Sequence, residues 1–380
     1  MQVLPVASGK GGVGKSLVAA NLSIALAQAG MSVILADLDL GGSNLHTILG
    51  MRAPRRGIGT FVTDGGTELS SYIVPTQYDN LKFIPGDTEI PGLANLATFQ
   101  KKRLMKKLRG LDADVLLLDL GSGTSFNTLD FFLMSGRGIV VTTPNLTAIL
   151  NGYLFLKNAV FRLIETSFPR KSPAAAHLKS IKSNSELLQR IYIPRLLEEL
   201  RGLDEKGYDA YTGRKNRFHP MLVLNLLDDP KDSGRVSKIR RTCIEYLDLD
   251  VEHLGVVYRD SLQEVALSSG LPIMVYKPQS VLSQAILRVA EKVCQYRDEE
   301  IEEAEDESFD ESYEVADAEA EADFNTKMLY VQDLIGGGAL TQSDLVETIR
   351  MQQYELSGLR KENRLLKAKL VEAINAGFPR

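Results

Sequence analysis

A glycine-rich stretch near the N-terminus holds the residues best suited to chemistry. It reads Ser8-Gly9-Lys10-Gly11-Gly12-Val13-Gly14-Lys15-Ser16 and fits G-x-x-x-x-G-K-[ST], a pattern whose backbone N–H groups surround phosphate oxygens. An apolar run, residues 3–7, precedes it, and a helical run, residues 17–29, follows it. This succession of strand, loop and helix predicts a phosphate-binding loop.

The pattern assigns a role to the positions of the loop. Lys15 is expected to reach the β- and γ-phosphates of a nucleotide, and the Ser16 hydroxyl to bind Mg²⁺. The start of the next helix adds the positive end of its dipole. We therefore predict that the nucleotide is bound by Gly9, Lys10, Gly11, Gly12, Val13, Gly14, Lys15, Ser16 and Leu17.

Two further apolar runs, residues 32–37 and 115–118, are predicted to be buried parallel strands. Asp37 and Asp39 stand at the end of the first run, and Asp119 follows the second. In an open α/β sheet, ligands bind at the carboxyl ends of strands. These carboxylates are therefore expected beside the phosphates, with Asp119 holding Mg²⁺ through water.

Lys10 is a second lysine inside the loop and lies outside the general pattern. With it, the loop resembles that of the deviant Walker A ATPases, the MinD/ParA family. The resemblance covers roughly residues 1–297 and implies an α/β P-loop fold with a mostly parallel, doubly wound sheet. It also implies ATP and Mg²⁺ as ligands and a slow hydrolysis that a partner protein stimulates.

The same resemblance implies roles for individual residues. Lys10 would cross a homodimer interface to the partner's ATP, and Asp39 would orient the attacking water and contact the Mg²⁺ shell. The implied catalytic residues are Lys10, Lys15 and Asp39, and the implied metal ligands are Ser16, Asp39 and Asp119. In this family an asparagine at a strand end hydrogen-bonds the adenine, which would be Asn225 in the strand predicted at residues 221–227. The alternative is a buried asparagine satisfied by the backbone.

Two features resemble the FlhG/FleN-like branch, whose members regulate flagellar placement and number. They are the run Gly-Gly-Ser-Asn-Leu-His at residues 41–46 and a polar, mostly helical insert at about residues 166–216. This implies an ATP-controlled dimerisation switch that positions or counts a cellular structure. The insert either recognises a protein partner or only packs on the body.

Other function classes remain as alternatives. A ParA-like partition ATPase would use non-specific DNA binding. An iron–sulfur carrier is disfavoured because Cys243 and Cys294 form no C-x-x-C pair. No stretch approaches the ~20 apolar residues of a membrane span, so we expect a cytoplasmic protein without an integral membrane segment.

The net charge of −5 conceals a segregation of charge along the 380 residues. Residues 1–297 carry a net charge of +8, and a helix predicted at residues 93–108 has a basic face. Residues 298–323 contain 15 acidic residues and no Lys or Arg. We predict a basic ATPase domain followed by an acidic linker, residues 298–326, that stays disordered because it has few apolar residues.

The last segment, residues 327–380, is predicted to be a helical tail. Leucines and other apolar residues repeat at heptad positions over about residues 343–374, with Asn363 at an a position. Glu residues at g positions match Lys and Arg residues at e positions of a parallel partner. We predict a parallel two-stranded coiled coil, and the alternative is an amphipathic helix lying on the body.

Overall fold

The computed structural model describes residues 1–40, 42–54, 56–63, 68–86, 96–183, 191–298 and 306–336, with residues 346, 350 and 353. The chain divides into two units, Met1–Asp323 and Phe324–Arg380, and the first unit holds the predicted ATPase domain. All but three positions of the coiled coil predicted at residues 343–374 lie outside the described residues.

An eight-stranded sheet forms the centre of the first unit, in the order β3-β4-β2-β5-β1-β6-β7-β8. All neighbouring strands are parallel except β3, which pairs antiparallel with β4. This confirms the predicted α/β fold with a mostly parallel sheet. The strands are β1 (Gln2–Ala7), β2 (Val33–Leu38), β3 (Val74–Pro75), β4 (Leu81–Ile84), β5 (Val115–Leu120), β6 (Ile139–Thr142), β7 (Met221–Leu227) and β8 (Glu252–Tyr258).

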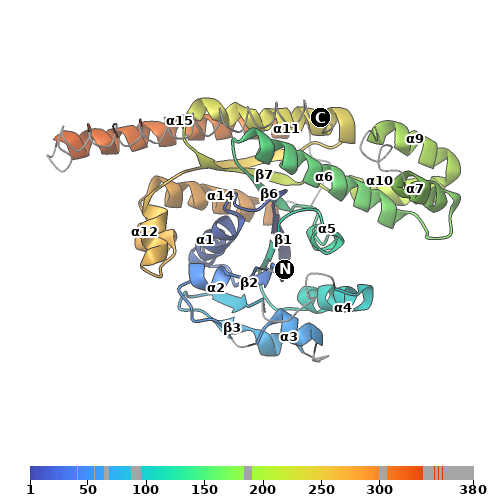
Figure 1. Cartoon of the computed structure of the whole chain (residues 1–380), viewed down its shortest axis with the longest axis horizontal. Helices are drawn as coiled ribbons and strands as arrows, with labels where there is room; N and C mark the ends of the chain where they lie inside the picture. Colours follow the sequence, from blue (N-terminus) through green and yellow to red (C-terminus); the bar gives the residue numbers. More distant parts are fainter. Residues whose placement is uncertain are drawn as a thin grey trace, which may run out of the picture. The chain divides into compact units, whose positions relative to one another are not determined.

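Helices cover both faces of the sheet, which explains why the central strands are almost wholly apolar. One face carries α1 and α14, which pack on each other with α12 and α13 beside them (Figure 1). Their apolar side chains and those of the sheet form one buried core. The bounds are α1 (Lys15–Gln28), α12 (Leu262–Ser268), α13 (Ile273–Tyr276) and α14 (Val281–Asp298).

The opposite face carries α5, α6 and α11, with α4 beside them (Figure 1). These helices are α4 (Thr98–Arg109), α5 (Phe126–Phe132), α6 (Leu146–Ser167) and α11 (Val236–Leu247). Shorter elements complete the unit: α2 (Leu45–Ile48), α3 (Ile58–Thr63), η1 (Leu69–Tyr72) and η2 (Pro230–Arg235). Among the described residues, no helix combines the length and apolar character needed to cross a membrane.

The insert predicted at residues 166–216 is mostly helical over its described residues. It consists of the end of α6 followed by α7 (Pro173–Ser183), α9 (Ile193–Leu203) and α10 (Glu205–Lys215). α10 packs on α6, and Arg214 Nη1 donates to Leu163 O at 3.4 Å. The insert therefore extends the helical face of the sheet that carries α6.

The prediction of a disordered acidic linker is wrong for residues 306–323. They form the first part of a helix, α15 (Asp306–Gly336), and belong to the same compact unit as the sheet. The sequence contains the signal for this helix: four residues at helical spacing are 8% exposed or less, namely Phe309, Tyr313, Ala316 and Ala320. That stripe buries enough apolar surface to hold an otherwise acidic helix.

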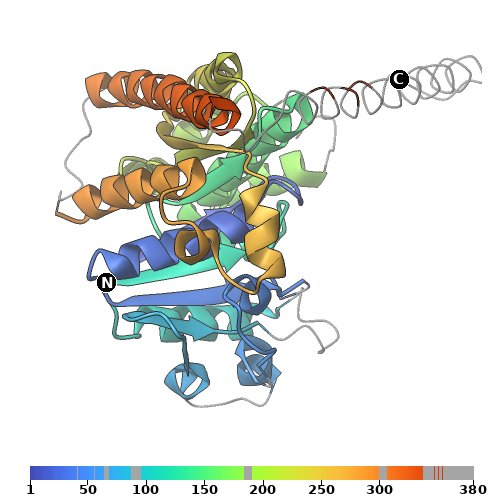
Figure 2. The ribbon, with the colours of Figure 1, turned by 90° about the vertical axis from the view of Figure 1, so that its left-hand side faces the viewer.

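Hydrogen bonds and ion pairs fix this part of α15 across β8, between α11 and α14. Tyr313 Oη donates to Val251 O and Tyr258 Oη donates to Ala320 O, both at 2.8 Å. The acidic side chains of α15 face cations of the body: Arg240 pairs with Asp310, Arg288 with Asp323, and Lys292 with Glu319. In Figure 2, the part of α15 that belongs to this unit, residues 306–323, lies above α14.

The edge strand β3 is very short. Tyr72 ends the 3₁₀ turn η1, and β3 contains only Val74 and Pro75. Proline lacks the N–H that would extend the ladder, and it is confined to such edge positions.

Candidate nucleotide-binding and hydrolysis site

The register of three parallel strands brings the predicted acids to the phosphate-binding loop. Asp37 on β2 lies directly opposite Asp119 on β5, and Asp119 lies opposite Val6 on β1. The loop begins just after β1 ends. The three strand ends therefore meet at one edge of the sheet, as predicted.

Two glycines let this loop approach its neighbours closely. Gly14 has a φ of 82°, in the left-handed region that glycine tolerates best. A Cβ on Gly14 would lie 2.2 Å from Asn225 Nδ2, and a Cβ on Gly9 would lie 2.0 Å from Asn151 O. Both positions require glycine, so the spacing that identified the loop in the sequence is also a packing requirement.

Lys15 has an ion-pair partner at the base of the loop. Its Nζ lies 2.5 Å from Asp119 Oδ1 and 3.2 Å from Ser16 Oγ, and both charged side chains are almost fully buried. Burial raises the pKa of Asp119, and the Lys15 ammonium opposes this rise. The predicted nucleotide ligand Lys15 and the predicted metal ligands Ser16 and Asp119 thus form one cluster.

Asp37 is fully buried beside this cluster. Burial, followed by the neighbouring Asp119 carboxylate, raises the pKa of Asp37 to about 7. Ser43 Oγ donates to Asp37 Oδ2 at 2.5 Å, and the Asp39 N–H donates to Asp37 Oδ1 at 3.1 Å. Asp37 therefore holds the loop that carries Asp39, and it presents no free carboxylate edge for a ligand.

Asp39 has a different environment, although it is only two residues away. It is half-buried and lines a cavity of about 230 Å³ with Gly121 and Ser122. A Cβ on Gly121 would lie 3.4 Å from Asp39 Oδ1. A carboxylate beside a small cavity can contact water there. The predicted role of Asp39 in orienting the attacking water stays a prediction.

Lys10 points away from Lys15. Its Nζ donates to Thr147 Oγ1 at 3.0 Å, at the first turn of α6. The Ser8 hydroxyl donates to Lys10 O at 2.9 Å and fixes the backbone of the lysine. The structure therefore brings Lys15, Ser16, Asp39 and Asp119 to one edge of the sheet, and it places the Lys10 ammonium outside that cluster.

Asn225 lies beneath the loop. It is 2% exposed, and its Nδ2 donates to Val13 O at 2.8 Å. The next residue, Leu226, has a φ of 58° at a shift in the β7–β8 register, a strained conformation of the kind found at functional sites. Here the amide nitrogen braces the loop, which is the second of the two roles expected for it. A contact with adenine stays a prediction.

The site contains contributors that the motifs did not identify. Asn145 caps α6 by accepting from the Thr147 N–H, and Thr147 and Asn151 on that helix touch Lys10 and Gly9. The sequence signal for these residues is their position just after β6. Because the carboxyl ends of parallel strands lie at one edge of the sheet, a turn after β6 is expected near the loop.

The residues present fit a magnesium nucleotide. Within the described part of the chain, no group of three His, Cys, Asp or Glu side chains could hold a metal by itself. Mg²⁺ at phosphates needs only one or two protein oxygens besides the phosphates and waters, and Ser16 and Asp119 supply these beside Lys15. Bound there, Mg²⁺ would neutralise charge that develops on the phosphates.

These features define the class of the protein. A glycine-rich loop joins the first strand to the first helix, its lysine is buried at the base of the loop, and acids end the two adjacent strands. This arrangement is that of a P-loop nucleoside triphosphatase.

Comparison with known proteins narrows this class. A sequence profile described as "ParA: NUBPL iron-transfer P-loop NTPase" matches residues 1–153. The antiactivator FleN of Pseudomonas aeruginosa is 30% identical over 296 residues, which cover 77% of this chain and 86% of FleN. The chain belongs to the MinD/ParA family of P-loop ATPases, and its resemblance to the FleN-like branch is confirmed.

Further relatives agree with this assignment. The flagellum site-determining protein YlxH of Helicobacter pylori is 31% identical over 161 residues, 40% of this chain and 52% of YlxH. The septum site-determining protein MinD of Pyrococcus horikoshii, solved with Mg-ADP, has the same fold, with a TM-score of 0.54 and 22% identity over 78% of this chain and 97% of that one. MinD of Aquifex aeolicus in the MinC:MinD complex has a TM-score of 0.51 and 17% identity, covering 78% of this chain and 96% of that one.

Proposed function

We propose that this protein is an ATP-hydrolysing dimerisation switch. Mg-ATP binds between the loop and Asp39, and two copies close face to face over their nucleotides. Lys10 of each copy then reaches the phosphates bound by the other. Hydrolysis removes the terminal phosphate and lets the copies separate.

The observation that carries this proposal is the placement of Lys10. A lysine whose only role was to bind its own nucleotide would point into the loop, whereas Lys10 points to the first turn of α6. Its partner there is the uncharged Thr147, and an exposed ammonium–hydroxyl bond of this kind is easily exchanged. The lysine is therefore available to a second copy.

A stripe of exposed leucines beside Lys10 supplies a surface for that copy. Leu146, Leu150 and Leu154 are 76%, 54% and 38% exposed, and residues four apart lie on one face of a helix. The stripe begins one residue before Thr147. An exposed apolar stripe beside Lys10 can serve as the contact surface of a nucleotide-dependent dimer.

Sedimentation velocity with Mg²⁺ and a non-hydrolysable ATP analogue tests this interface. The full chain is used with Leu356, Leu359 and Leu366 replaced by Glu, so that a tail coiled coil does not mask the association. Leu150→Glu should abolish nucleotide-dependent dimers, whereas Leu203→Glu, an equally charged change at an exposed leucine of α9, should leave them intact. Equal dimerisation of both variants would contradict the proposal.

The tail would then act as a permanent tether. Two bodies joined by a coiled coil meet at roughly millimolar effective concentration, so ATP would close a dimer that is already paired. The unmodified tail should keep the chain dimeric without nucleotide, and the triple Leu→Glu variant should not. If the triple variant is still dimeric without nucleotide, the tail is not the tether.

We infer further that the switch helps to position or count a cellular structure, with the flagellum as first candidate. The similarity to YlxH, a flagellum site-determining protein, supports this inference. The experiment is capture of partners from the native cell with an Asp39→Ala variant loaded with ATP. Flagellar assembly or regulatory proteins among the partners would support the role.

The second candidate is a ParA-like partition ATPase that binds DNA non-specifically. The net charge of +8 on residues 1–297 favours it. It predicts ATP-dependent, salt-sensitive binding to any duplex sequence. Iron–sulfur transfer has less support, because Cys243 is buried in α11 and Cys294 lies on a different helix, α14.

A further inference from the structure

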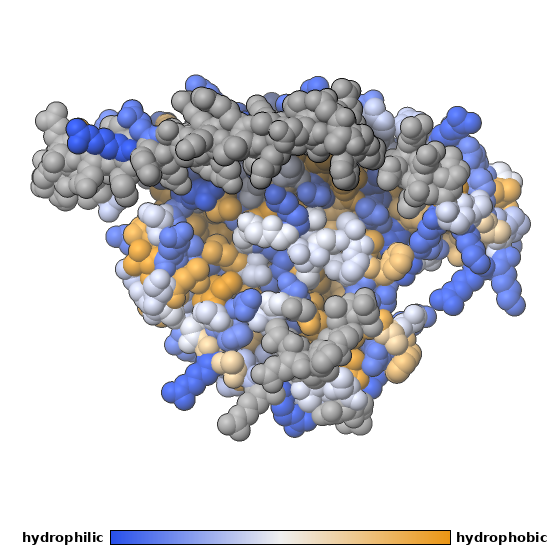
Figure 3. All heavy atoms as spheres, viewed as in Figure 1, coloured by the Kyte–Doolittle hydropathy of each residue, from blue (hydrophilic) through white to orange (hydrophobic). Residues whose placement is uncertain are grey.

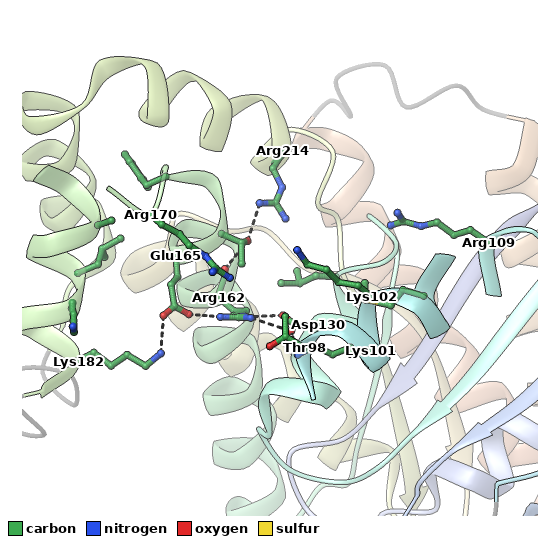
Figure 4. Close-up of a pocket in the computed structure, with 17 residues that line it drawn as sticks. Thr98, Lys101, Lys102, Arg109, Asp130, Arg162, Glu165, Arg170, Lys182 and Arg214 are labelled. Carbon is green, nitrogen blue, oxygen red and sulfur yellow. Dashed lines mark hydrogen bonds and ion pairs between the residues drawn. The ribbon is translucent and has the colours of Figure 1, made fainter. Parts of the chain in front are cut away.

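A large basic pocket lies between α4 and the helical insert, outside the nucleotide site. Its volume is about 910 Å³, within the size range of small-molecule sites. α4, α5 and the end of α6 form one side, and α7 and α10 form the other (Figure 4). Figure 3 shows blue, hydrophilic side chains projecting from the insert on this side of the molecule.

The charge of this pocket is strongly unbalanced. Eight cationic side chains line it against two carboxylates, Asp130 and Glu165. Both carboxylates are already used: Asp130 pairs with Lys101 and Arg162, and Glu165 pairs with Arg162 and Lys182. The positive charge that no carboxylate of the pocket neutralises therefore belongs to the other cationic side chains.

Those side chains come from opposite walls. Within the described part of the chain, no carboxylate pairs with Lys102 on α4, Arg170, Lys179 on α7 or Arg214 on α10. Figure 4 shows Arg214 and Lys102 extending from different helices, with the Arg162 network below both of them in this view. Cations on opposite sides of a hollow repel one another, and an anion bound between them would offset this repulsion by attracting both.

Arg214 gives the sharpest indication of such an anion. Arg214 is half-buried, and its Nη1 donates to three neutral oxygens, Thr166 Oγ1 at 2.9 Å, Ser167 Oγ at 3.0 Å and Leu163 O at 3.4 Å. Burial and the neighbouring Arg217 lower the pKa of its guanidinium. Guanidinium groups pair best with the two oxygens of a phosphate or carboxylate.

Apolar side chains also line the pocket. Met105 and Leu133 come from α4 and the end of α5, and the largely buried Phe168 and Leu178 come from the insert side. A bare inorganic anion would leave these apolar side chains without a contact. A ligand that joins an apolar body to several anionic groups matches both kinds of lining side chain.

We propose that this pocket binds a small organic phosphate, a ligand with an apolar or aromatic body and at least two phosphate groups. Phosphates satisfy the excess of positive charge with few atoms, and the concave, drug-sized volume suits a small ligand better than a peptide or a duplex. The site is separate from the P-loop and does not depend on the proposed dimer switch.

The test is calorimetric titration of the full chain, saturated with Mg-ADP to occupy the P-loop, with adenosine 3′,5′-bisphosphate as probe. The Lys102→Gln/Arg214→Gln variant should bind the probe at least tenfold more weakly. The matched control is Arg195→Gln/Lys206→Gln, which removes two positive charges from α9 and α10 outside the pocket, and it should change the affinity less than twofold. Lys102→Gln alone, an exposed change on α4 that leaves the core untouched, should still weaken binding several-fold.

Three results would overturn the proposal. The first is the absence of binding by the unmodified chain. The second is equal weakening by the pocket and control variants, which shows a general charge effect. The third is binding of a poly-glutamate peptide or a 12-base-pair duplex in place of the bisphosphate, lost in the pocket variant, which assigns the groove to a macromolecule.

Discussion

Lys10 Nζ lies 3.0 Å from Thr147 Oγ1 in the same chain. The lysine that distinguishes this loop from the general P-loop pattern is thereby held on α6, beside a stripe of exposed leucines. A dimer in which Lys10 crosses to the partner must break this bond. In the proposed dimer, Thr147 would compete with the partner's phosphates for the same ammonium group.

Replacing Thr147 should shift that competition. Thr147→Val removes the hydroxyl and keeps the β-branched shape, so the nucleotide-dependent dimer should become tighter by about twofold to tenfold, the range of one exposed hydrogen bond. Thr147→Ser keeps a hydroxyl and should behave like the unmodified chain. Sedimentation equilibrium with Mg²⁺ and an ATP analogue measures both. A weaker dimer for Thr147→Val would show that the hydroxyl acts in the dimer itself.

The bond from Asn225 to Val13 O separates two roles for this asparagine. As a brace beneath the loop, it supports any nucleoside triphosphate, so Asn225→Ala should weaken ATP and GTP by similar factors of about tenfold. As an adenine ligand, it would affect ATP alone and leave GTP unchanged. Titration of both nucleotides decides between the roles. Asn158→Ala, which removes a half-buried asparagine of α6 away from the loop, should leave both affinities unchanged.

The raised pKa of Asp37 makes stability depend on pH. Because folding raises this pKa to about 7, the folded state retains a proton that the unfolded state has released. The stability that this proton contributes is fully present below about pH 4 and is lost as pH rises through about 7. The loss is on the order of 4 kcal/mol.

Urea unfolding between pH 4 and pH 8 measures this contribution. Asp37→Asn, which cannot titrate, should lack the decline that the unmodified chain shows as pH rises. Asp209→Asn, a change at an exposed carboxylate of α10, should retain it. Parallel pH profiles for Asp37→Asn and the unmodified chain would mean that the carboxyl group is ionised throughout this range.

The packing of α15 on the sheet should depend on the small side chain of Ala316. Ala316 is 0% exposed, so Ala316→Glu places a charge in an apolar contact and should release the helix. Hydrogen exchange of residues 309–323 should then speed up at least tenfold. Ala318→Glu is the matched control, because Ala318 is exposed on the same helix. Equal exchange in the two variants would mean that the alanine stripe does not hold the helix.

Sequence patterns predicted the site better than they predicted its surroundings. Loop, strands and acids follow from spacing because parallel strands bring their ends to one edge, and the register of Asp37 with Asp119 confirms this. The contacts of Thr147 and Asn151 depend on how α6 packs, which no local pattern encodes. The prediction of disorder for residues 306–323 is wrong because it rests on the acidic composition of the segment. The helical spacing of Phe309 and Tyr313, which indicates a buried face, does not enter it.

The central claim is that one terminal phosphate is held by two copies of the chain through Lys10. Sedimentation velocity of an Asp39→Ala variant with Mg-ATP, in the background with Glu at Leu356, Leu359 and Leu366, tests it most directly. Adding Lys10→Ala should leave ATP binding detectable and convert the dimer to monomer. If the Lys10→Ala chain dimerises with ATP as strongly as its parent, two copies do not share the phosphate and the account is contradicted.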